Sequence, residues 1–255
     1  MFRLSATANA DPNELARTAA IDFARRFVQC WQEALGTELL GAYLIGSLAH
    51  AGFNRRYSDI DLAIITAAGL SQDALDGLKS NAVALSTDWG PKVSVFWADQ
   101  HFAIGRFPPL DRIDYLDHAV ALMEREHLTP PRPTIDEIRQ YLRGATFATW
   151  VERAQSFAET EALKPNDHKM YLRTILYPGR FYYSWMTARI GSNEDAVAFL
   201  NERPLAGLDV GLIARALRCR QAAADPDGLF PARTTLPSQF DACAKLIADG
   251  SGPAG

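Results

Sequence analysis

The chain has 255 residues, of which 48% are hydrophobic and 22% are charged, and this is the composition of an ordinary globular protein. Its net charge of -4 and its pI of about 5.7 show no excess of positive charge, which disfavours a stable nucleic-acid partner. No apolar run of about 18 residues could span a bilayer, and the first residues are too polar for a signal peptide, so we expect a cytoplasmic protein without a membrane partner.

The first hundred residues predict a small sheet with helices packed on one face. An amphipathic helix is expected over residues 11–35, where apolar residues recur at steps of four. These residues are Leu15, Ala19, Phe23, Phe27 and Trp31. Three short apolar segments, residues 39–46, 59–66 and 94–98, are typical of buried strands, and residues 71–82 between the last two are predicted to be helical. The alternation of strand and helix indicates an α/β layer with a mixed sheet.

A proline-rich segment, residues 129–133, is the predicted linker to a second domain, because proline interrupts both helix and sheet hydrogen bonding. Thr134 followed by Glu137 then forms a capping box that opens a helix. From there the chain is predicted to be helical almost to its end. The expected fold class is therefore α+β, with an N-terminal domain over residues 1–130 and an α-helical bundle over residues 131–255.

Two features subdivide the predicted bundle. Ser192 with Asp195 matches a second capping box and starts another helix. Residues 168–190 have helical spacing, but Pro178 and Gly179 interrupt them, so a kink or a break is expected there.

The residues that indicate chemistry lie between positions 41 and 65. A predicted strand ends in Gly46 and Ser47, where glycine lets a phosphate approach the backbone and the next helix offers N–H groups and the positive end of its dipole. Asp59 and Asp61 follow, and two residues separated by one position on a strand project from the same face. Paired carboxylates repel unless a cation shares them, and Mg²⁺ prefers such oxygen ligands while leaving places for phosphate oxygens. The pattern predicts a site for a metal-bound nucleoside triphosphate.

The Asp-x-Asp pair alone leaves other interpretations open. A solvated strand end is the commonest of these, and haloacid-dehalogenase phosphatases and many glycosyltransferases also use the pair. In those two classes an apolar strand precedes the acids, whereas here the polar residues 54–58 precede them. The Gly-Ser element upstream favours the nucleotide site.

The order of strand, Gly-Ser, short helix, loop and Asp-x-Asp resembles the polymerase-β-type nucleotidyltransferase superfamily. Residues 169–200 resemble the helical C-terminal domain of the aminoglycoside adenylyltransferases of the streptomycin and spectinomycin type. The resemblance implies transfer of a nucleoside monophosphate, AMP from ATP, to a hydroxyl of a small molecule or protein, with two Mg²⁺ ions and release of pyrophosphate. It implies that Gly46 and Ser47 hold the triphosphate, and that Asp59 and Asp61 are the catalytic residues that hold the metals. The acceptor stays unidentified.

One departure from the family concerns its third acid, which lies on the next strand and ligates a metal or activates the attacking hydroxyl. Here residues 91–99 form that strand, and its parity turns Lys92 and Ser94 toward the site. Neither is an acid. Asp88 precedes the strand in a turn, and Asp99 has the opposite parity. We therefore expect Lys92 to be a nucleotide-binding residue that neutralises phosphate charge.

Two explanations remain for the missing acid. Another group, such as Glu161 or Asp167 of the helical domain, replaces it as the base. Alternatively, the protein is a catalytically weakened nucleotide-binding relative, such as an antitoxin-like regulatory protein.

Several other polar residues receive no role in the predicted site. The five histidines lack the paired spacing of a zinc helix, and none is assigned. Arg173 and Arg180 are seven residues apart and share one side of a helix, and they are assigned to packing or ion pairs. For Arg55 and Arg56 two interpretations stay open, namely solvated residues of a loop or contacts to a phosphate.

Overall fold

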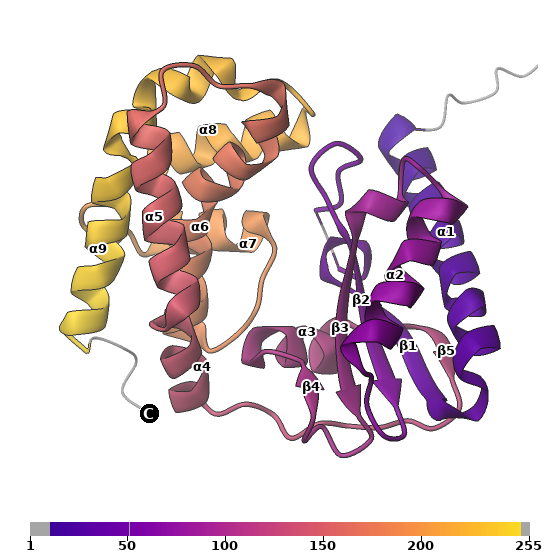
Figure 1. The fold of residues 1–255 in the computed structure, drawn as a ribbon. Helices are drawn as coiled ribbons and strands as arrows, with labels where there is room; N and C mark the ends of the chain where they lie inside the picture. The colour runs from indigo at the N-terminus through magenta and orange to yellow at the C-terminus, as the bar shows by residue number, and fades with distance from the viewer. Residues whose placement is uncertain (1–10, 51, 251–255) are drawn as a thin grey trace, which may run out of the picture.

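The computed structural model describes residues 11–50 and 52–250. Figure 1 shows two groups of elements side by side, a sheet with its helices and a group made of helices alone. The strands are β1 (Leu39–Ile45), β2 (Ile60–Thr66), β3 (Val93–Asp99), β4 (Gly105–Arg106) and β5 (Val120–Glu124). The helices of the sheet group are α1 (Pro12–Leu35), α2 (Gln72–Leu85) and α3 (Pro109–His118). The second group comprises α4 (Ile135–Leu142), α5 (Ala145–Glu159), α6 (His168–Thr187), α7 (Asn193–Glu202), α8 (Val210–Gln221) and α9 (Leu236–Ala248). The predicted α+β class is confirmed.

The sheet is mixed, with the strand order β4-β3-β2-β1-β5. Strand β1 pairs antiparallel with β2 and with β5, β2 pairs parallel with β3, and β3 pairs antiparallel with β4. The three strands predicted from apolar runs are all present. The edge strands β4 and β5 were not predicted, because they are short and mostly exposed and so lack an apolar run.

Helices α1 and α2 cover one face of the sheet, where apolar side chains of β2 meet Phe23, Phe27 and Trp31 of α1. Burying each such aromatic side chain stabilises the fold by roughly 1.5–3 kcal/mol. The predicted stripe on α1 is wrong over its first two positions, since Leu15 is 59% exposed and Ala19 is exposed, whereas Ala16 and Ala20 are buried. Steps of four residues drift by about 40° each around a helix, so the third and fourth steps back from Trp31 leave the buried face.

Helix α3 packs against the opposite face of the sheet, on the side that faces the helical group (Figure 1). The ring of Tyr115 on α3 lies edge-on to the ring of Tyr43 on β1, with 4.9 Å between centroids. The predicted arrangement, with helices on one face of the sheet, therefore holds for α1 and α2, whereas α3 covers part of the second face. The uncovered part of that face borders the helical group.

Both predicted capping boxes are present. The side chain of Thr134 accepts a hydrogen bond from the backbone N–H of Glu137, and Ser192 accepts one from Asp195, at the first turns of α4 and α7. In each box the acid returns a bond to the backbone N–H of the capping residue. Two of the N–H groups that a helix start leaves unpaired are thereby satisfied.

Helix α6 is the centre of the helical group, and it continues through Pro178. The predicted break is therefore wrong. Proline in a helix interior removes one hydrogen bond, but Pro178 and Gly179 are both buried among apolar neighbours here, and that packing holds the helix together. Because the helix is continuous, Lys169, Arg173 and Arg180 lie on one face of it.

The proline-rich segment over residues 129–133 connects β5 to α4 as an irregular stretch (Figure 1). A division into domains over residues 1–130 and 131–255 remains a proposal. The two groups also touch elsewhere, because Tyr57 of the sheet group is part of the helical core and its hydroxyl donates a hydrogen bond to the Ala224 carbonyl.

Candidate active site

A cavity of about 430 Å³ lies between the sheet and the helical group. Its sheet wall is formed by the ends of β1, the start of β2, β3 and α3, and its helical wall by α4, α5 and α6. Four residues singled out in the sequence, Gly46, Ser47, Asp59 and Asp61, border this cavity together. The structure thus brings two separated sequence elements into one site.

Gly46 follows β1 in a conformation that favours glycine, with φ of 67°. A Cβ atom at this position would lie 2.5 Å from Oδ2 of Asp61, which is closer than real atoms approach. Its backbone N–H donates a hydrogen bond of 2.7 Å to Oδ2 of Asp114 on α3. Glycine is therefore required here because two carboxylates crowd the backbone on either side.

Asp61 lies in the second position of β2, with Ile45 and Ser94 as its partners on the neighbouring strands. No hydrogen bond or ion pair joins its carboxylate to another residue within positions 11–50 and 52–250. Burial, and then the nearby negative charge of Asp59, raise the pKa of Asp61 to about 7. The site therefore holds a carboxylate whose charge is poorly compensated.

Asp59 directly precedes β2 and is 29% exposed. Its carboxylate pairs with two cations of α6, the ammonium of Lys169 and the guanidinium of Arg173, the latter at 3.5 Å. The two predicted acids thus differ, since Asp59 is neutralised from the helical wall and Asp61 is not. Their hard oxygen donors could hold a divalent cation in competition with these side chains. Among the described residues no group of three His, Cys, Asp or Glu side chains is arranged to hold a metal.

Two acids of α3, which no sequence pattern singled out, also border the cavity. Asp114 is buried, and Asp111 is partly exposed. Burial and then the charges of Asp61 and Asp114 raise the pKa of Asp111 to about 7, and burial raises the pKa of Asp114. A spacing of three residues in a helix puts both carboxyls on one face, and this is the signal that could have found them.

The helical wall carries positive charge. Arg180 borders the cavity, and its side chain is exposed there. Within the part of the chain that the structure describes, its guanidinium makes no hydrogen bond or ion pair. Desolvation lowers its pKa. Of the two arginines assigned to packing or ion pairs, Arg173 does form an ion pair and Arg180 is available to a ligand.

Another arginine fixes the loop that precedes the acids. Arg220 of α8 donates hydrogen bonds of 3.2 Å to the Tyr57 carbonyl and 2.9 Å to the Ser58 hydroxyl. Burial lowers the pKa of Arg220 to about 10. The contact ties the loop that carries Asp59 to the helical group.

The remaining wall is aromatic. Four aromatic side chains of α4, α5 and α6 border the cavity: Tyr141, Trp150, Tyr177 and Phe181. The hydroxyl of Tyr177 is buried without a hydrogen-bond partner among the described residues. Such a wall suits an organic ligand that carries polar groups.

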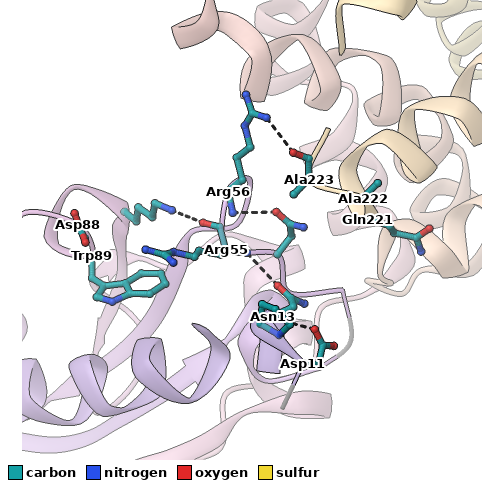
Figure 2. Close-up of a pocket in the computed structure, with 12 residues that line it drawn as sticks. Asp11, Asn13, Arg55, Arg56, Asp88, Trp89, Gln221, Ala222 and Ala223 are labelled. Carbon is teal, nitrogen blue, oxygen red and sulfur yellow. Dashed lines mark hydrogen bonds between the residues drawn. The ribbon is translucent and has the colours of Figure 1, made fainter. Parts of the chain in front are cut away.

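Lys92 does not border this cavity but a second one, of about 630 Å³. Figure 2 shows that second cavity, with Trp89, Arg55 and Ala223 among the residues that line it. The ammonium of Lys92 donates to the carbonyl of Arg55 and lies 5.2 Å from the ring centroid of Trp89. Residue 92 ends a short 3-10 turn before β3 begins, so strand parity does not orient its side chain. Lys92 thus borders the second cavity, and its role in nucleotide binding stays a prediction.

Two other sequence expectations concern the missing third acid. Ser94 does border the cavity and lies beside Asp61 on the adjacent strand, as its parity predicted. Glu161 and Asp167 are not among the residues that line the cavity, since they lie in the connection from α5 to α6. Of the five histidines, His50 borders the cavity, with its Nε2 atom 3.6 Å from Oδ1 of Asp114.

No helix in the described part of the chain is long and apolar enough to cross a membrane.

The sequence matches no protein-family profile, and it matches no curated protein. The fold is similar to that of spectinomycin adenyltransferase AAD(9) from Enterococcus faecialis, in a structure with ATP and spectinomycin, at a TM-score of 0.61 and 14% identity. This match covers 88% of the present chain and 99% of the other. A toxin-antitoxin structure with AMP-PNP matches at a TM-score of 0.31 and 16% identity, covering 52% of this chain and 92% of the other, and that score is too low to compare folds. With the five-stranded mixed sheet and the helical group that follows it, the chain has the polymerase-β-type nucleotidyltransferase fold.

Proposed function

We propose that the protein is a nucleotidyltransferase, which transfers a nucleoside monophosphate from a nucleoside triphosphate to a hydroxyl group of an acceptor. The observation that carries the proposal is the arrangement of one cavity. Two acids beside a Gly-Ser turn, Asp59 and Asp61, border the same cavity as Arg180, an arginine that forms no hydrogen bond or ion pair among the described residues. An acidic wall for a cation and a basic wall for phosphates together suit a metal-bound triphosphate.

Asp59 and Asp61 are the proposed ligands of Mg²⁺, two ions by analogy with the family. The residues fit the ion, because they offer hard oxygen donors and the Asp61 carboxylate forms no ion pair among the described residues. Two carboxylates leave coordination places for phosphate oxygens and water. When bound, Mg²⁺ supplies positive charge that polarises the phosphate and stabilises the leaving pyrophosphate.

The side chains of the chain itself supply position and charge. Gly46 and Ser47 are proposed to hold the triphosphate at the start of the turn after β1. Lys169 and Arg173, now paired with Asp59, and the open Arg180 would face the negative oxygens. The acceptor oxygen attacks the α-phosphorus in line, and the bond from that phosphorus to the bridging oxygen breaks. Pre-positioned cations stabilise the charge that develops on the departing pyrophosphate.

ATP is the proposed nucleotide, and a small molecule is the proposed acceptor. The adenyltransferase with the similar fold was solved with ATP and spectinomycin, which makes both compounds the first to test. A cavity of about 430 Å³ is in the usual size range for small-molecule sites. Aromatic and acidic side chains in its wall, among them Trp150 and Asp111, favour an acceptor that carries hydroxyls and positive charge.

A second candidate function is nucleotide binding without transfer, in a regulatory relative of these enzymes. The observation that favours it is Ser94, which occupies the strand position beside Asp61 where the family places its third acid.

One experiment separates the two. Purified protein is mixed with MgATP labelled on the α-phosphate and with spectinomycin or other hydroxyl compounds, and both nucleotide affinity and labelled product are measured. We expect Mg²⁺-dependent binding and transfer in the parent, and loss of both by at least 100-fold in Asp61→Asn. Asp241→Asn, a change at an exposed position of α9, is the matched control. Binding without any transfer would favour the regulatory function, and a fully active Asp61→Asn would contradict the assigned site.

A further inference from the structure

The proposed reaction needs a group that takes the proton of the acceptor hydroxyl, and the strand beside Asp61 does not provide one. The residue paired with Asp61 on β3 is Ser94, whose hydroxyl is a poor base. Helix α3, however, crosses the same face of the sheet and brings Asp111 and Asp114 to the cavity. An acid has therefore reached the site from a helix instead of from the strand.

The two acids of α3 have different surroundings. The side chain of Asp114 is 3% exposed, and its Oδ2 atom accepts the N–H of Gly46 at 2.7 Å. Its Oδ1 atom is buried without a hydrogen-bond partner among the described residues and lies 3.6 Å from Nε2 of His50. Asp114 is thus committed to holding the turn after β1 in place, as a positioning residue.

Asp111 is not committed in this way. Within the described ranges, no other residue donates a hydrogen bond to its carboxyl or forms an ion pair with it. It is partly exposed and borders the cavity. Asp61 and Tyr141 border the same cavity as Asp111. Asp111 therefore shares this cavity with the proposed metal ligands and with the aromatic wall, against which the acceptor would lie.

Position also distinguishes a base from a third metal ligand. Over the described residues, no three acidic, histidine or cysteine side chains are arranged to hold one ion, so Asp111 does not complete a ligand set with Asp59 and Asp61. A carboxyl that borders the cavity outside such a ligand set can act on the attacking oxygen.

We propose that Asp111 is the general base of the transfer reaction, an inference that rests on the proposed function. Its carboxylate takes the proton of the acceptor hydroxyl while a lone pair of that oxygen forms the bond to the α-phosphorus. The bond from the α-phosphorus to the bridging oxygen breaks, and its electron pair leaves with the pyrophosphate. Asp111 then returns the proton to water.

The test compares the parent with Asp111→Asn and Asp111→Glu in the release of pyrophosphate from MgATP. The acceptor probes are spectinomycin and, in a second series, water alone, whose attack gives AMP. We expect Asp111→Asn to lower kcat by about 100-fold or more, the range of general-base catalysis, with the Kd for MgATP changed by less than about twofold. Asp111→Glu, which keeps a carboxyl, should retain more activity than Asp111→Asn. Asp117→Asn, on the exposed side of the same helix, is the matched control.

The outcomes separate this inference from the proposed function. Parental release by Asp111→Asn, or loss of MgATP binding in a variant with unchanged melting temperature, would overturn the role of Asp111 while the parent still transfers. If both Asp111 variants fail to fold, Asp111→Ser and Asp111→Ala are compared instead, and release of pyrophosphate at the parental rate by either folded variant overturns the inference. A parent that binds MgATP without releasing pyrophosphate overturns it as well. A parent that does not bind MgATP contradicts the proposed function itself.

Discussion

The two walls of the central cavity have opposite charge. The sheet wall holds four acids, Asp59, Asp61, Asp111 and Asp114, beside one arginine, Arg106, and the helical wall holds Arg173 and Arg180 of α6. The walls neutralise each other only in part. Lys169 and Arg173 pair with Asp59, whereas Asp61 and Arg180 form no hydrogen bond or ion pair among the described residues. Charged side chains that stay unpaired in the folded protein are typical of a binding site, because a bound ligand of opposite charge then stabilises them.

The difference between the acidic and the basic wall indicates a different role for each. The acidic wall is formed by strand ends and a helix on one scaffold, so its carboxylates are held at fixed separations. The basic wall is presented by one face of α6, whose long side chains can exchange one anionic partner for another. We infer that the sheet side fixes the position of metal and nucleotide, and that the helical side supplies adjustable positive charge.

The largest expected effect in this comparison comes from removing the open cation of the basic wall. Arg180→Gln should weaken MgATP binding by about 10-fold to 100-fold, because a charge-assisted hydrogen bond contributes about 1.5–3 kcal/mol. Isothermal titration with MgATP measures the change. Arg189→Gln, an exposed arginine just beyond α6, is the control and should bind like the parent. Equal affinity in all three proteins would mean that the basic wall does not contact the phosphates.

A smaller effect is expected in the stability of the acidic wall. The pKa of Asp61 is raised to about 7 from an ordinary value of 3.8, chiefly by burial. The folded protein therefore holds a proton that the unfolded chain has lost, and this contribution to stability decreases as pH rises from about 4 through 7. Without metal and nucleotide, Asp61→Asn should melt a few degrees above the parent at pH 8, and the difference should shrink at pH 5. Thermal denaturation of both proteins at these pH values is the measurement.

Mg²⁺ and ATP serve as the control for that stability difference. Both should narrow it at pH 8, because the parent gains a bound ligand that the variant has lost. A difference in melting temperature that does not depend on pH would contradict the uncompensated state of Asp61.

The smallest effect is expected outside the two walls. Lys92 lies in the second cavity with its ammonium on the Arg55 carbonyl, so Lys92→Ala should change the affinity for MgATP by less than about twofold. The same titration measures it, beside Arg180→Gln as the positive comparison. A loss as large as that of Arg180→Gln would show that Lys92 turns to the phosphates when the nucleotide binds.

The sequence predicted the acidic wall better than the basic one, and the reason is locality. Gly46, Ser47, Asp59 and Asp61 lie within sixteen positions of one another, in the turn after β1 and at the start of β2, and all four border the cavity. Capping boxes at Thr134 and Ser192 are equally local, and both are present. Patterns that span one turn or one strand need no knowledge of the tertiary fold.

The errors and omissions are of the opposite kind. Asp111 and Arg180 are ordinary helix residues until α3 and α6 are placed on either side of one cavity, which no local pattern specifies. The orientation expected for Lys92 rested on strand parity, which does not apply in the 3-10 turn that holds this residue before β3. The break expected at Pro178 is absent because tertiary burial outweighs the local cost of proline.

The most direct test of the central claim is a crystal structure of the parent protein with Mg²⁺ and a non-hydrolysable ATP analogue. The account predicts metal density between the triphosphate and the carboxylates of Asp59 and Asp61, with phosphate oxygens facing Arg180. A triphosphate bound elsewhere, for example against Trp89 in the second cavity, with no metal at the two acids, would contradict it.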